Sequence, residues 1–117
     1  MKIDIYQIDA FANKVFEGNP AAVCPLEQWL PDTLLQKIAQ ENNLSETAFF
    51  VPKDKGYQLR WFTPKDEVDL CGHATLASAY VISKFIDTSL KTISFKSRSG
   101  ILTVDVLGDD SYTMNFP

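Results

Sequence analysis

The spacing of apolar residues divides the chain into several β-type segments and two helical segments. In Lys2–Phe11 the alternation of apolar residues slips by one position, which predicts a strand with a bulge. Glu17–Pro20 predicts a turn, because Gly and Asn tolerate unusual backbone angles and Pro forbids a continuing helix. Further strands are predicted at Ala21–Leu26, Thr47–Val51, Tyr57–Trp61, Thr92–Ser97, Ile101–Leu107 and Tyr112–Phe116.

Two segments have helical patterns. Pro31–Asn43 repeats apolar residues along one face, and it ends where two Asn residues compete with the helix for backbone hydrogen bonds. Gly72–Phe85 is apolar nearly all round, which predicts a helix buried on most sides. Between them, Thr63–Asp69 is expected to be a polar loop whose charges, Lys65–Glu67, are solvated. The order ββαββαβββ predicts an α+β fold, a mixed sheet wrapped around a central helix.

The composition and the net charge limit the classes of protein to which this chain can belong. With 117 residues, 45% hydrophobic and 22% charged, the chain is expected to form one globular domain. The net charge of −4 and the lack of a basic block argue against binding of nucleic acid or anionic membrane. An acid at Asp4 excludes a signal peptide, so we expect a cytoplasmic protein whose two Cys are free thiols. One His and two distant Cys predict no metal site, and the longest uncharged run, Leu70–Ser83, is too short to cross a bilayer.

The start of the second helix combines a thiol, a glycine and the only histidine. The first turn of a buried helix leaves N–H groups without partners and has a positive dipole end, which favours an anion such as a carboxylate. The same field is expected to lower the pKa of Cys71, and His73 can move a proton near neutral pH. We therefore predict a carboxylate-binding, proton-transferring site formed by Cys71, Gly72, His73, Ala74 and Thr75. The simpler alternative is that Cys71 is core packing and His73 a capping side chain.

Glu46 is a second candidate, because it lies between Leu44 and an apolar strand. A carboxylate partly withdrawn from water has its charged form disfavoured, so its pKa is expected to rise toward that of a useful acid or base. Ser45 beside it is a candidate contact for a substrate oxygen, and Asn19 for a ligand or simply for a turn. The alternative for Glu46 is a solvated carboxylate at a strand end. A thiol-redox role is weak, because the two Cys lack CxxC spacing.

Three segments in fixed order resemble the PhzF-like, or phenazine biosynthesis-like, family of isomerases: DAFANKVFEGNPAAV, IAQENNLSETAFF and FTPKDEVDLCGHATLASAY. The resemblance is close from Ile8 to Tyr80 and looser to the final MNFP. It implies the diaminopimelate epimerase-like fold, in which two similar lobes each wrap a curved sheet around a helix and the active site lies between them. Residues 1–117 then correspond to the N-terminal lobe, and the second lobe is absent.

The resemblance also implies roles for particular residues. Glu46 matches the family's acid/base carboxylate, Ser45 a substrate contact, and Gly72 with His73 the substrate-binding helix start. Cys71 matches a catalytic thiol of diaminopimelate epimerase, whereas the phenazine isomerase has a small residue there, so either Glu46 or Cys71 could lead the reaction.

The expected function is half of a cofactor-independent isomerase or epimerase that moves a proton at a carbon of a small carboxylate-bearing metabolite. The expected partners are this substrate and the second lobe. A lone lobe would also expose an apolar cleft face, through which a homodimer could form. The alternative is a catalytically silent module of the same fold that binds a metabolite or another protein.

Overall fold

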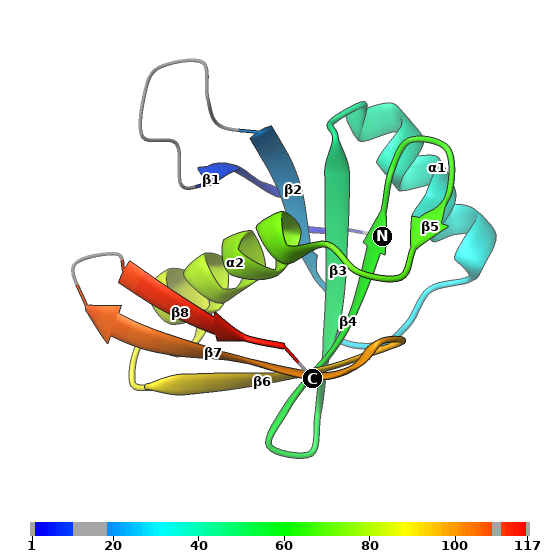
Figure 1. The fold of residues 1–117 in the computed structure, drawn as a ribbon. Helices are drawn as coiled ribbons and strands as arrows, with labels where there is room; N and C mark the ends of the chain where they lie inside the picture. The colour runs from blue at the N-terminus through cyan, green and yellow to red at the C-terminus, as the bar shows by residue number, and fades with distance from the viewer. Residues whose placement is uncertain (1, 11–18, 109–110, 117) are drawn as a thin grey trace.

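The computed structural model describes residues 2–10, 19–108 and 111–116. Within them the chain forms eight strands, two α-helices and one π-helical turn (Figure 1). The elements are β1 (Tyr6–Ala10), β2 (Asn19–Pro25), α1 (Asp32–Asn42), β3 (Glu46–Lys53), β4 (Gly56–Phe62), β5 (Glu67–Val68), α2 (Gly72–Val81), the π-turn η1 (Ile82–Ile86), β6 (Thr92–Ser97), β7 (Gly100–Gly108) and β8 (Ser111–Asn115).

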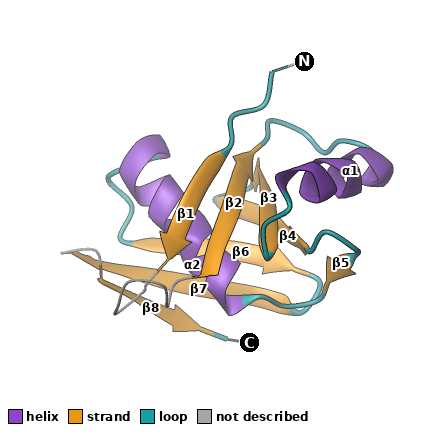
Figure 2. Cartoon of the chain, turned by 90° about the horizontal axis from the view of Figure 1, so that it is seen from above, coloured by secondary structure: helices purple, strands orange, loops and turns teal. Residues whose placement is uncertain are grey.

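The strands form one mixed sheet in the order β1-β2-β3-β4-β6-β7-β8, and β5 pairs with β4. Figure 1 shows α2 between β1–β3 on one side and β6–β8 on the other, so that the sheet curves around the helix. The pairs β2–β3 and β4–β6 are parallel, and the other neighbours are antiparallel. A parallel pair needs a crossover, which α1 supplies for β2 and β3 from the other side of the strands (Figure 2). The α+β fold with a curved sheet around a central helix is confirmed.

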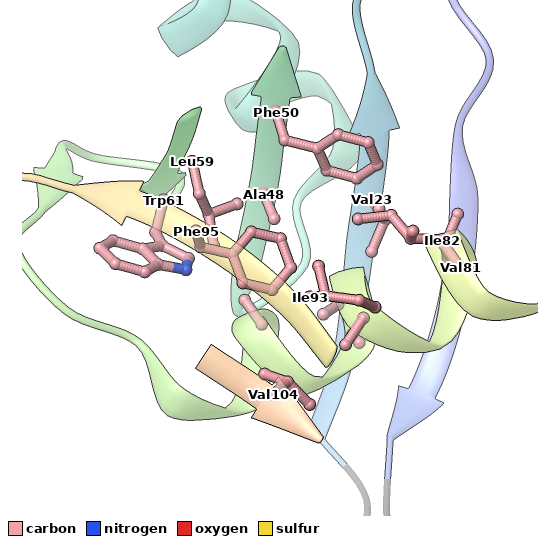
Figure 3. Packing of buried hydrophobic residues seen from close by; sticks show 14 of the residues in the cluster. Val23, Ala48, Phe50, Leu59, Trp61, Val81, Ile82, Ile93, Phe95 and Val104 are labelled. Atoms are coloured by element: carbon pink, nitrogen blue, oxygen red, sulfur yellow. The ribbon is translucent and has the colours of Figure 1, made fainter. Parts of the chain in front are cut away.

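Two hydrophobic clusters hold this arrangement together. The larger one lies between the sheet and α2, where Val23 and Phe50 from the strands point toward Val81 and Ile82 (Figure 3). The smaller one lies under α1 and includes Leu35 and Ala39 of that helix. The prediction that the second helix is buried on most sides is confirmed, because its small residues Ala74, Ala77 and Ala79 are fully buried. Small side chains let the strands approach the helix closely from several directions.

The predicted bulge in the first strand is wrong. Tyr6–Ala10 pairs with β2 in unbroken register, and residues 2–5 are not part of the strand. The alternation slips because Ile3 packs in the smaller cluster, whereas Tyr6 and Ile8 pack in the larger one. The predicted turn at Glu17–Pro20 lies partly outside the described residues, and its last two residues already belong to β2.

Two other elements differ from the sequence predictions. The long second helix becomes a π-helical turn at Ile82, where the backbone N–H of Asp87 donates to the Ile82 carbonyl over 2.8 Å. The loop at Thr63–Asp69 contains the two-residue strand β5, which pairs with Trp61 and Phe62. A two-residue strand has no periodicity to detect, so sequence patterns miss it.

The sheet has a narrow seam between β4 and β6. Only Tyr57 with Phe95 and Gln58 with Lys96 pair there, whereas β3 and β4 pair over seven residues. Gly56 begins β4 at this seam, and a Cβ at this position would lie 2.5 Å from the backbone oxygen of Ser94. Backbone cannot yield to such a contact, so this close approach requires glycine.

Candidate functional site

The amino-terminal ends of β3 and α2 meet at one place. Glu46 is the first residue of β3 and lies opposite Ala21 of the parallel strand β2. Cys71 is the N-cap residue of α2, with an extended backbone. The Glu46 carboxylate lies near enough to the thiol of Cys71 to raise the pKa of that thiol. The fold therefore brings together the two side chains that the sequence put forward for the chemistry.

One carboxylate oxygen of Glu46 has an unusual environment. Its Oε2 atom is buried and has no hydrogen-bond partner among the described residues. Buried carboxylate oxygens in folded proteins are almost always hydrogen-bonded. An orphan oxygen beside a helix start makes this place the candidate site.

The prediction that the helix field lowers the pKa of Cys71 is wrong in its net direction. Burial raises the pKa of this thiol above its ordinary value, and the nearby Glu46 carboxylate raises it further. The backbone N–H groups of Ala74 and His73 act in the opposite direction and offset this only in part. Near neutral pH, Cys71 is accordingly a protonated thiol and a hydrogen-bond donor, not a standing thiolate.

Thr75 has a structural role in place of the predicted substrate contact. It is fully buried, and its N–H donates to the Cys71 carbonyl over 3.1 Å. Its hydroxyl donates to the same carbonyl over 2.7 Å and accepts a hydrogen bond from Trp61 Nε1 over 3.0 Å. Both polar groups of Thr75 are used inside the protein, where they fix the backbone of Cys71.

Replacing Thr75 by Val is expected to lower the free energy of unfolding by about 1–3 kcal/mol. Valine keeps the shape but leaves the Trp61 N–H buried without an acceptor, and such a group retains its full desolvation cost. Urea denaturation followed by circular dichroism measures the change. Thr113→Val, at an exposed position of β8, is the matched control and is expected to change stability little. Equal stabilities of the two variants would contradict the structural role of Thr75.

The other predicted site residues surround the same point. Gly72 and His73 are half-buried in the first turn of α2, Ala74 is fully buried, and Ser45 is exposed just before β3. Asn19 begins β2, but its side chain lies outside the described part of the structure. Their substrate contacts stay predictions.

Gly72 has a packing role that the sequence did not reveal. A Cβ at this position would lie 2.9 Å from Met114 Cε and 3.7 Å from Phe116 Cζ. Strand β8 and the residue that follows it therefore pack closely over the start of α2. Phe116 is still 55% exposed, so this edge of the site has an apolar side chain open to further contacts.

Two kinds of feature are absent from the described residues. Over residues 2–10, 19–108 and 111–116, no three His, Cys, Asp or Glu side chains are grouped so that they could hold a metal ion. Over the same residues, none of the helices has the length and apolar character needed to span a membrane.

The amino-acid sequence is similar to those of known proteins. The family model described as phenazine biosynthesis-like protein matches residues 8–116. An uncharacterized isomerase of Pseudomonas aeruginosa is 58% identical over 117 residues, which is 100% of this chain and 45% of that protein. An uncharacterized isomerase of Halalkalibacterium halodurans is 53% identical over 110 residues, covering 93% of this chain and 42% of that protein.

The fold is also similar to that of a solved structure from the same family. The crystal structure of a PhzF-family phenazine biosynthesis protein from Enterococcus faecalis aligns with a TM-score of 0.88 and 53% identity. The alignment covers 93% of this chain and 42% of that one. The chain thus spans less than half the length of the relatives that it matches.

Proposed function

Because this chain belongs to the phenazine biosynthesis-like family, we propose that it forms the first lobe of an isomerase that moves a proton on a small carboxylate. The observation that carries the proposal is the buried Oε2 of Glu46, which has no hydrogen-bond partner in the described part of the chain and lies beside the thiol of Cys71. A carboxylate held in this way is suited to accept a proton from a substrate carbon and return it at another position or face.

The two candidate groups act together in this proposal, with Glu46 leading. Burial keeps Cys71 protonated near neutral pH, so the carboxylate is the group able to accept a proton. The thiol lies beside the carboxylate and can supply a proton in the return step, after which the proton on Glu46 restores the thiol. His73, half-buried in the first turn, polarises or orients the substrate.

The start of α2 provides a place for the substrate carboxylate. The first N–H groups of a helix have no partner inside the helix, and the dipole favours a negative charge there. We propose that the substrate carboxylate binds at Gly72–Ala74. The remainder of the longer protein closes the opposite side, because orientation and exclusion of water need groups on both sides of a reacting molecule.

Incubation in heavy water tests this function. The complete protein is mixed with a panel of small carboxylates that carry an acidic C–H bond, and exchange is followed by proton nuclear magnetic resonance. We expect enzyme-dependent loss of one C–H signal for at least one member, with formation of an isomer. Stabilisation by a carboxylate without any C–H exchange would instead favour the silent binding module.

A further inference from the structure

A charged network lies outside the candidate site and holds the segment that leads into α2. Arg60 of β4 donates two hydrogen bonds to the Glu67 carboxylate of β5, each over 2.8 Å. Arg98, in the turn between β6 and β7, lies 3.3 Å from Glu67 and 3.4 Å from Asp69. We refer to Arg60, Glu67, Arg98 and Asp69 as the arginine network.

Arg60 makes several further contacts that hold its side chain in place. Its guanidinium lies over the rings of Trp29 and Phe62, at 5.2 and 5.4 Å from their centres, and contacts Asp32 at 3.0 Å. The hydrogen bonds from Arg60 hold the pKa of Glu67 below its usual range. The expectation that Lys65–Glu67 are all solvated is therefore wrong for Glu67, whose side chain is only 17% exposed.

The network reaches the backbone beside the candidate site. Ser99, next to Arg98, donates its hydroxyl to the backbone carbonyl of Asp69 over 2.6 Å. Asp69 is two residues before Cys71, and residues 69–71 have no regular secondary structure. On the other side of Cys71, its carbonyl is held by Thr75. The N-cap residue is thus fixed from both directions along the chain.

We propose that Arg98, with Glu67 and Asp69, positions the thiol of Cys71 against Glu46. The proposal rests on the proposed function for its catalytic meaning, and these three are positioning residues that touch no reacting atom. The two-residue strand β5 pairs with β4 at two positions, and Leu70 is 45% exposed, so the Arg98 contacts add to the packing of Val68 and Cys71 against the larger cluster. Loss of the Arg98 contacts would let Cys71 move away from the carboxylate and toward water.

The test uses Arg98→Gln, with Lys96→Gln as the matched control. Lys96 is exposed two residues earlier on β6, so its substitution removes the same charge from the same area. The rate of alkylation of Cys71 by iodoacetamide is measured from pH 6 to pH 10, with mass spectrometry of the Cys71 peptide. Cys24 is fully buried, and burial raises its pKa to about 12, so it serves as an internal indicator of global unfolding.

Arg98→Gln is expected to alkylate Cys71 about threefold faster or more near neutral pH, with a lower pH midpoint, while Lys96→Gln matches the parent protein. The sign follows because both burial and Glu46 raise the pKa of this thiol, and a displaced Cys71 loses part of both effects. Arg98→Lys keeps the charge but not the two-armed geometry, so it should restore part of the difference. Ser99→Ala should change the rate in the same direction by less.

The same rate and pH midpoint in Arg98→Gln and Lys96→Gln would overturn the proposal. So would equal acceleration at Cys24, because that pattern indicates general unfolding. The assay needs no substrate, so its outcome is independent of whether Glu46 catalyses a reaction. If the heavy-water experiment fails while the alkylation difference holds, the proposed function fails and the positioning of the thiol stands.

Discussion

Replacement of Glu46 by Gln is expected to lower the turnover of the complete protein at least about a hundredfold, as for the loss of a general base. The amide is nearly the same size as the carboxylate but cannot accept a proton from carbon. Incorporation of deuterium from heavy water into the substrate should fall by the same factor, because both measurements depend on the same proton transfer. Binding of the substrate should change much less, since the start of α2 is intact.

A matched control separates this effect from a simple change of charge. Glu41 is exposed on α1, and Glu41→Gln is expected to leave turnover unchanged. Normal turnover and normal deuterium uptake in Glu46→Gln would remove Glu46 from its proposed role. A larger loss in Cys71→Ala than in Glu46→Gln would instead make the thiol the leading group, which is the alternative that the sequence left open.

Trp61→Ala is expected to lower the free energy of unfolding by about 3–5 kcal/mol, the range found when large core side chains are truncated. Trp61 is fully buried between β4 and α2, facing the larger cluster (Figure 3). Its loss leaves a cavity and removes the hydrogen bond to Thr75, which helps to fix Cys71. A loss of this size is a large fraction of the stability of a small domain, and urea denaturation followed by far-ultraviolet circular dichroism would measure it.

The second tryptophan is the natural comparison. Trp29 is half-buried, donates to Gln58 over 2.9 Å and stacks under Arg60. Contacts of this kind at a partly exposed site are worth about 1 kcal/mol, so Trp29→Ala should cost far less than Trp61→Ala. Similar losses of stability in the two variants would contradict the central place given to Trp61 in the core.

The parts of the structure that depend on local pattern were predictable from sequence. The buried helix α2 follows from an apolar run of small residues, and the end of α1 follows from Asn42 and Asn43, the latter in a left-handed conformation. The meeting of Glu46 with Cys71 was also expected, but on the basis of three family-like segments. Periodicity places each residue on its own element and gives no distance between elements.

The sequence predictions that were wrong concern residues whose surroundings depend on neighbours far away in the sequence. The pKa of Cys71 follows from its burial and from Glu46, and neither is set by the helix start alone. Thr75 was expected to face a substrate, yet its hydroxyl is used by Trp61 across the core. The sequence predicts that Glu67 is a solvated charge in a loop, because only the folded sheet brings Arg60 and Arg98 into contact with it. These are effects of tertiary contacts, which override local preference.

The narrow seam between β4 and β6 has a consequence for how the molecule assembles. The meander β6–β8 joins neighbours in sequence, so its loop-closure entropy is small and it can form rapidly. The seam joins Gln58 to Lys96 across an intervening helix and offers two residue pairs to offset that entropy. The hairpin β3–β4 and the meander should therefore mature as separate kinetic units, and docking at Gly56 would be the late event that commits the chain to its native topology.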